Sequence, residues 1–83
     1  MKHYQYRTQG TCSQAIEFDI ADDGTLHNVV FHGGCNGNLQ GIARLVEGMN
    51  AAEVARRIAH ISCNGGPTSC PDQLSQALKA ITA

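Results

Sequence analysis

Four cysteines, Cys12, Cys35, Cys63 and Cys70, are the residues of this chain with the most distinctive chemistry, at the spacing C-x22-C-x27-C-x6-C. A thiolate can hold zinc or an iron–sulfur cluster, and it is also the nucleophile of disulfide exchange. In a reducing cytosol such cysteines are more typical of metal or redox sites than of a permanent disulfide framework. Because the spacing contains no C-x-x-C pair, a shared site requires the fold to bring distant segments together.

The segment TSCPD, residues 68–72, indicates where one of these cysteines lies. Pro71 suits the first turn of a helix, where its missing N–H has no partner to lose. Ser69 is a good N-cap, and the carboxylate of Asp72 favours the positive end of the helix dipole. The pattern predicts Cys70 in the first turn of the last helix, where unpaired N–H groups favour the thiolate.

Glycines surround a second cysteine in the sequence GGCNGN. We expect Gly33, Gly34 and Gly37 to permit positive φ or a close backbone approach around Cys35. A glycine-rich loop that runs into a helix is also a phosphate-binding arrangement, so a nucleotide or small ligand is an alternative occupant. The loop lacks the lysine of a P-loop and the spacing of a dinucleotide fingerprint.

Histidines are the other metal-ligating side chains. His32 lies three residues before Cys35 and is a candidate additional ligand. The other three histidines, His3, His27 and His60, are expected at the surface. No Ser–His–Asp arrangement or carboxylate pair indicates hydrolytic chemistry.

Hydrophobic alternation in the first half of the chain predicts strands. Ile16, Phe18 and Ile20 alternate with acidic residues at the period of two that a half-buried strand requires. Strands are expected at residues 15–20 and 25–31, joined by the turn ADDG into a hairpin, with a third candidate at 3–7.

Apolar residues at helical spacing predict helices in the second half, at residues 38–46, 50–58 and 70–81. Gly48 suits the end of the first, and Asn50 with Glu53 resembles the capping box of the second. Strands followed by helices indicate one α+β domain over residues 1–83, with two to three helices on one face of a small antiparallel sheet.

Charge and composition exclude some partners. Six Lys and Arg against seven Asp and Glu give a net charge of −1 without runs of like charge, so neither nucleic acid nor an anionic membrane surface is an expected partner. No stretch approaches the ~18 apolar residues of a membrane helix, and we expect a cytoplasmic protein. A chain this short buries a slim core, which a metal or a partner subunit would supplement.

Taken together, GTCS, VVFHGGCNGNLQGI, LVEGM and TSCPDQL resemble the small four-cysteine TSCPD-domain family over nearly the whole chain. A related domain lies at the C-terminus of some cobalamin-dependent ribonucleotide reductases. The resemblance therefore implies a link to ribonucleoside-diphosphate reductase, with a reductase or a thioredoxin-like donor as partner. A chain of this length has no room for the radical-generating barrel, so an accessory domain is expected. A homodimer is also compatible with the sequence.

A fainter similarity is to the U-type iron–sulfur scaffold proteins. It implies that Cys12, Cys35 and Cys70 match the three cluster-binding cysteines of the scaffolds. Ser13 and Ser69 stand where the scaffolds carry an aspartate and a histidine. Cys63 would then supply a fourth ligand and close the site.

Two functional hypotheses follow. In the first, the four thiolates hold one zinc ion or an iron–sulfur cluster, between which the sequence does not choose. In the second, Cys63 and Cys70 cycle between dithiol and disulfide to re-reduce a reductase.

Overall fold

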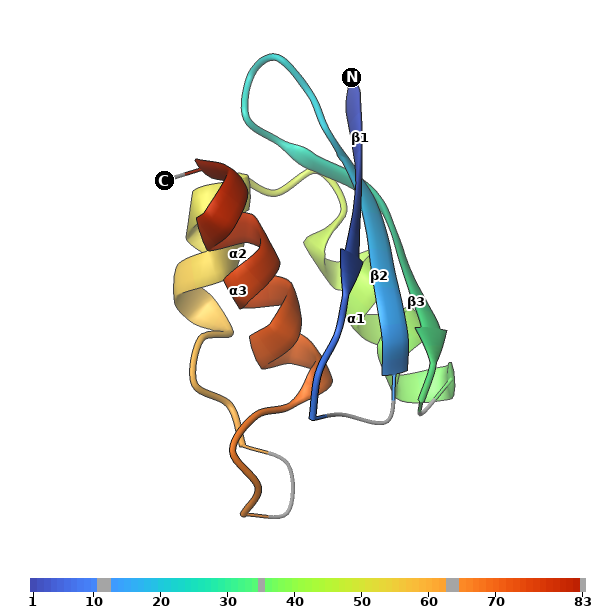
Figure 1. Ribbon diagram of the computed structural model, residues 1–83. Helices are drawn as coiled ribbons and strands as arrows, with labels where there is room; N and C mark the ends of the chain where they lie inside the picture. The colour runs from blue at the N-terminus through green and yellow to red at the C-terminus, as the bar shows by residue number, and fades with distance from the viewer. Residues whose placement is uncertain (11–12, 35, 63–64, 83) are drawn as a thin grey trace.

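The computed structural model describes residues 1–10, 13–34, 36–62 and 65–82. Its elements are the strands β1 (Lys2–Arg7), β2 (Ser13–Ile20) and β3 (Leu26–Gly33), followed by the helices α1 (Asn36–Val46), α2 (Ala51–Arg57) and α3 (Cys70–Thr82). Figure 1 shows the three helices gathered on one side of the sheet. The predicted α+β class is confirmed, and the third candidate strand is present as β1.

The sheet is an antiparallel meander in the order β1-β2-β3. The alternation that predicted β2 places Ile16 and Phe18 on the helix side, where both are fully buried. Tyr4 of β1 stacks on Phe18 with ring centroids 5.6 Å apart. The β2–β3 turn closes where the N–H of Gly24, at φ +85°, donates to the Ala21 carbonyl (2.9 Å), a backbone conformation that glycine adopts without steric cost.

Local capping rules account for the helices. The Asn50 side chain accepts a hydrogen bond from the N–H of Glu53 (3.0 Å) and so caps α2 as predicted. The Glu53 carboxylate instead forms ion pairs with Arg56 and Arg57 one turn later. Beyond the end of α1, Gly48 donates its N–H to the Leu26 carbonyl (2.7 Å), which ties the α1–α2 connection to the start of β3.

The core lies between the sheet and α3. Fully buried side chains from the sheet and from α3 form one cluster, which Val54 of α2 completes: Ile16, Phe18, Leu26, Leu74, Ala77 and Leu78. Ser75 is also fully buried, and its hydroxyl donates to the Ala55 carbonyl of α2 (2.6 Å). This bond satisfies a polar group inside the core and joins the two helices.

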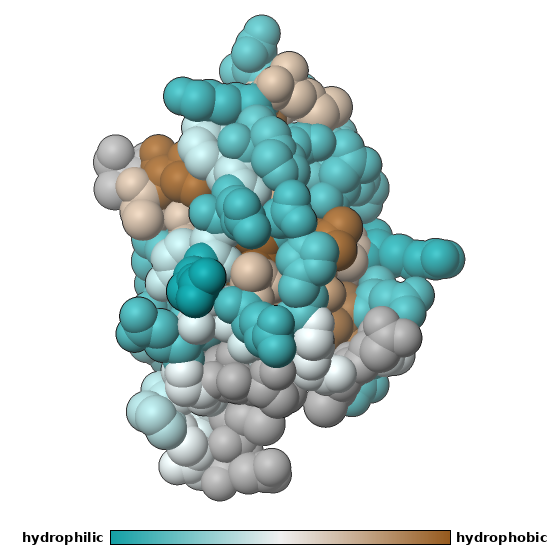
Figure 2. All heavy atoms as spheres, turned by 45° about the vertical axis from the view of Figure 1, so that its right-hand side comes forward, coloured by the Kyte–Doolittle hydropathy of each residue, from teal (hydrophilic) through white to brown (hydrophobic). Residues whose placement is uncertain are grey.

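The opposite face of the sheet is polar, as an antiparallel sheet covered on one side allows. In the view of Figure 2, hydrophilic residues cover most of the surface and hydrophobic ones form small separate patches. Across the described residues, no helix is both long enough and apolar enough to cross a membrane.

We expect Phe18→Ala to lower the free energy of unfolding by about 3–5 kcal/mol, because it leaves a cavity where the sheet meets α3. Val30→Ala is the matched control: Val30 is 47% exposed on β3, and its truncation should change stability by less than about 0.5 kcal/mol. Urea denaturation of both variants measures the difference. Similar losses in the two variants would contradict the position of the core.

Candidate functional site

The structure places one of the four predicted cysteine ligands. Cys70 is the first residue of α3, as predicted, and is only 7% exposed. Cys12, Cys35 and Cys63 lie outside the described residues. The convergence of four sulfurs therefore stays a prediction, and the geometry of the site is built from Cys70 and from the described neighbours of the other three.

Cys70 lies directly against the start of β2. Its thiol donates a hydrogen bond to the hydroxyl oxygen of Ser13 (3.1 Å), and both residues are buried. Ser13 is held in turn by Thr8, whose hydroxyl donates to the Ser13 carbonyl (2.5 Å). The first residue of α3 therefore contacts Ser13, the residue that follows Cys12 in the sequence.

The described neighbours of the remaining cysteines lie at the same end of the domain. Ser13 is the register partner of Gly33, two residues before Cys35. A cavity of about 550 Å³ has Gly37, Ser62 and Cys70 among its lining residues. In Figure 1 the ends of β1 and β3 and the starts of β2, α1 and α3 all lie toward the lower end of the molecule.

The glycines before α1 divide into two kinds. Gly33 and Gly34 have φ of +84° and +82°, the positive values that the glycine-rich sequence predicts. Gly37 lies inside α1, which begins two residues earlier than expected. A Cβ at Gly37 would meet nothing within 4 Å, so the expected positive φ or close approach is not found there.

Asp72 organises the turn that carries Cys70. Its carboxylate accepts hydrogen bonds from the Thr68 hydroxyl (2.6 Å), the His60 N–H (2.7 Å) and the Gln76 side chain (2.9 Å). These donors, the Thr68 hydroxyl foremost, lower the pKa of the Asp72 carboxyl against the opposing effect of burial. The carboxylate that the sequence assigned to the helix dipole also ties three parts of the chain together.

The N-cap of α3 completes the same turn. The Ser69 hydroxyl accepts from the Asp72 N–H (3.1 Å), which confirms the predicted cap. The neighbouring side chain of Gln73 donates to the Thr68 hydroxyl (3.0 Å) and accepts from the Gln9 N–H (3.0 Å). The TSCPD segment is therefore fixed both to its own helix and to the segment that follows β1.

A close approach reinforces this connection. Gly10 has φ +73°, and a Cβ there would lie 3.2 Å from the Thr68 methyl carbon. A larger residue would face both backbone strain and crowding. The glycine thereby lets the segment after β1 lie against the residues that precede Cys70.

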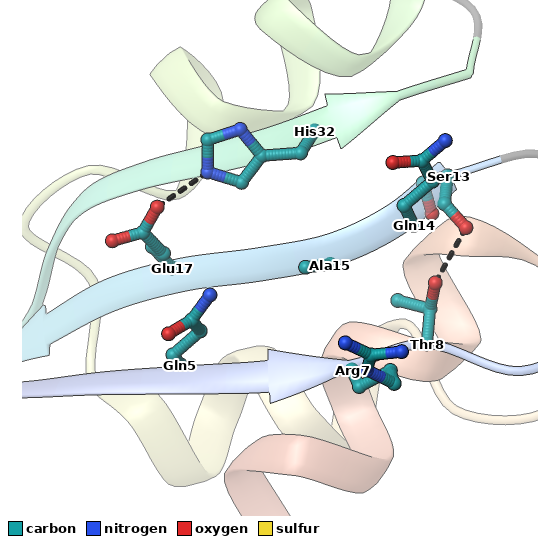
Figure 3. A pocket seen from close by; sticks show the side chains of 8 residues that line it. All are labelled: Gln5, Arg7, Thr8, Ser13, Gln14, Ala15, Glu17 and His32. Carbon is teal, nitrogen blue, oxygen red and sulfur yellow. Dashed lines mark hydrogen bonds and ion pairs between the residues drawn. The ribbon is translucent and has the colours of Figure 1, made fainter.

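A second hollow, of about 850 Å³, lies on the polar face of the sheet. Figure 3 shows Ala15 on the middle strand with Arg7 and His32 on either side. Its lining residues include Gln5, Arg7, Gln14, Ala15, Glu17 and His32. The small side chain of Ala15 leaves this basin open between larger polar ones.

His32, the candidate extra ligand, lies in this basin with its Nε2 atom paired to the Glu17 carboxylate. The other Glu17 oxygen accepts from His3 Nε2 (2.9 Å), and His3 Nδ1 donates to Asp19 (2.6 Å). Hydrogen bonds to the carboxylates of Asp19, the larger effect, and of Glu17 raise the pKa of His3. Hydrogen bonds from His32, the larger effect, and from His3 lower the pKa of Glu17.

The sequence reasoning missed this histidine–carboxylate cluster. His3 was expected only as a surface residue, yet it joins β1 to two carboxylates of β2. The signal was present in the strand alternation, which assigns His3, Glu17 and Asp19 to the polar face. His27, also expected at the surface, has a side chain 23% exposed and pairs with Glu47.

Within residues 1–10, 13–34, 36–62 and 65–82, no three His, Cys, Asp or Glu side chains form a group that could hold a metal ion. His32 belongs to no such group there. The four-cysteine hypothesis includes three residues outside these ranges, so this finding does not test it.

The TSCPD domain family model matches residues 2–82, and the chain belongs to this family. Neither the comparison with curated proteins nor that with solved structures found a match. The match spans both the strands and the helices, so the whole domain, rather than the TSCPD segment alone, defines the membership.

We predict that Asp72→Asn lowers the free energy of unfolding by about 1–3 kcal/mol at neutral pH, because one acceptor oxygen becomes an amide facing hydrogen-bond donors. The folded-state pKa of Asp72 is lowered. Its stabilisation is therefore present above the unfolded-state pKa, near 4, and is lost as the pH falls through the folded value. Urea titrations across the acid range should show the two proteins converging.

Asp22→Asn is the control for this pH dependence. Asp22 lies exposed in the β2–β3 turn, and its substitution should shift stability by less than about 0.5 kcal/mol at any pH. A stability difference for Asp72→Asn that stays constant through the acid range would contradict the role of the ionised carboxylate.

Proposed function

We propose that this domain holds one metal centre, a zinc ion or an iron–sulfur cluster, through the thiolates of Cys12, Cys35, Cys63 and Cys70. The observation that carries the proposal is the contact between Cys70 Sγ and Ser13 Oγ (3.1 Å). It joins the start of α3 to the residue that follows Cys12, across 57 positions of sequence. The register of Ser13 with Gly33 brings the chain near Cys35 to the same place.

The surroundings of Cys70 suit sulfur ligation. Its thiol donates to the Ser13 hydroxyl, and no Asp, Glu or His is among the described residues that line the adjoining cavity. The nearby Asp72 carboxylate is engaged with three donors. Thiolates are therefore the ligands that we expect at this end of the domain, and tetrahedral sulfur sites suit zinc or iron–sulfur clusters.

A closed four-thiolate centre would be structural. It would link the start of β2, the start of α1 and the start of α3, which the sequence separates widely. Because the ligands come together only in the folded chain, the free energy of binding adds to the stability of the fold. A domain with so small a core gains most from such a staple.

The thiol-redox role is the alternative. The position of Cys70 at the first residue of α3 favours the thiolate that disulfide exchange requires. In that role Cys63 and Cys70 would form the reversible pair. Both hypotheses use the same helix terminus, and they differ in whether a metal occupies the thiolates.

Elemental analysis and an absorption spectrum of the purified, unreduced protein test the proposal. We expect either stoichiometric zinc without colour or stoichiometric iron with sulfide and visible absorption. Cys70→Ser and Cys35→Ser should each lose the metal and melt at a lower temperature, because a structural centre contributes several kcal/mol. A chelator should lower the melting temperature of the parent.

Ser62→Ala is the matched control, because Ser62 precedes Cys63 in the sequence and its hydroxyl donates to the Gly66 carbonyl (2.8 Å) but supplies no thiolate. It should retain the metal. Protein that carries no metal and whose Cys63 and Cys70 oxidise reversibly would replace the metal proposal with the redox one. Cysteine variants that melt like the parent would refute a structural centre.

The partner proposal rests on the family resemblance. We propose that the domain serves a ribonucleotide reductase, or its thioredoxin-like donor, as an accessory module. Turnover of CDP with a dithiol and cobalamin should stay at background with the pure domain and rise when a separate reductase is present. Deoxynucleotide formed by the domain alone would contradict an accessory role.

A further inference from the structure

Leu45 marks an apolar trough on the helical side of the domain. It lies on α1 and is 79% exposed, which is the highest exposure among the large apolar residues of the described chain. Two hollows, of about 550 Å³ and about 330 Å³, share Leu45 and Ile42 in their walls. One hollow extends to Ile61 and the other to Ile58. The trough therefore follows α1 from the end of the domain where α3 begins toward α2.

The floor of the trough contains space that no described residue fills. Gly37 and Gly41 lie one turn apart on α1, and a Cβ at either would meet nothing within 4 Å. Glycine inside a helix lowers its stability by roughly 0.5–1 kcal/mol relative to alanine. Two such glycines beside an exposed leucine suit the close approach of another backbone.

Basic side chains lie in and beside the trough. Arg57 is the charged residue among those that line the two hollows, and none of these described residues is Asp or Glu. Its Nε atom bonds Glu53 (2.7 Å), while its terminal nitrogens make no further bond within the described residues. Arg44 is the one charged residue of α1 and has no ion pair in the described part of the chain. The trough thus offers cations to its occupant.

We propose that this trough binds an acidic amphipathic helix of a partner protein. A partner helix would place apolar side chains at i, i+3 or i+4, and i+7 on both sides of Leu45. Its carboxylates would pair with Arg44 and Arg57 at the rim, where charge sets specificity and association rate. A second copy of this chain fits less well, because its α1 carries no acidic residue and would bring no carboxylate from that helix to Arg44 or Arg57.

Two labelled peptides of about 20 residues test the proposal, each with leucines at helical spacing and either glutamate or lysine on the remaining positions. Fluorescence anisotropy should show the glutamate peptide binding at least about tenfold more tightly than the lysine peptide, with a difference that shrinks as salt rises. Amide NMR shifts should change along α1 and α2. Equal affinity for both peptides, or shifts confined to the sheet, would overturn the proposal.

Three variants locate the interaction. Leu45→Ser should weaken binding at least about tenfold, and Val30→Ser, an exposed apolar residue on the sheet, should leave it unchanged. Gly41→Ala should raise the melting temperature, because alanine stabilises a helix relative to glycine. The same substitution should weaken peptide binding, because the added methyl group occupies space in the trough. Binding that survives both Leu45→Ser and Gly41→Ala would overturn the assignment.

Self-association is the remaining outcome. A concentration-dependent dimer that Leu45→Ser abolishes, measured by sedimentation, would assign the trough to a second copy and overturn the partner helix. All these measurements use the protein as purified and detect contacts with α1. Their failure leaves the metal content unchanged, so it is distinguishable from failure of the proposed centre.

Discussion

A buried carboxylate must be matched by hydrogen-bond donors, and this requirement determines the structure at the end of the domain where α3 begins. Asp72 is 6% exposed, and an ionised group in that environment is costly unless its oxygens accept hydrogen bonds. The donors come from residues 60, 68 and 76. Their hydrogen bonds to Asp72 therefore hold together the segment after α2, the TSCPD segment and the second turn of α3. Cys70 lies two residues before Asp72 and takes its place from this network. In this position the thiol donates to the Ser13 hydroxyl (3.1 Å).

The sequence predicts those features that depend on neighbouring residues. Alternation in β2, the cap at Asn50 and the cap at Ser69 are each determined by residues within one turn or one strand, and the structure has all three. The prediction for Gly37 is wrong, because α1 begins two residues earlier than expected and includes this glycine. Helix propensity does not determine the exact first residue of a helix. The bonds from Asp72 to His60 and from His3 to Glu17 and Asp19 depend on how distant segments pack. A single sequence carries no direct signal for such pairs, although the strand period does place His3 and Glu17 on one face.

The candidate sites lie on different parts of the domain: the polar face of the sheet, the helical side and the end where α3 begins. The polar face of the sheet carries the histidine–carboxylate cluster and the open basin at Ala15. The helical side carries the trough beside Leu45. The end where α3 begins carries Cys70 and the described neighbours of the other cysteines. A metal centre at that end would hold the starts of three elements in fixed positions, including the start of α1 that leads into the trough, so the proposed centre and the proposed docking surface would share one helix.

We propose that thiolates alone surround one metal at the end of the domain where Cys70 contacts Ser13. X-ray absorption at the metal edge of the purified protein tests it most directly, because the first shell reports both the ligand type and the ligand number. We expect a shell of four sulfur atoms per metal, at about 2.3 Å for zinc. A shell made of nitrogen and oxygen, or protein that contains no metal, would contradict it.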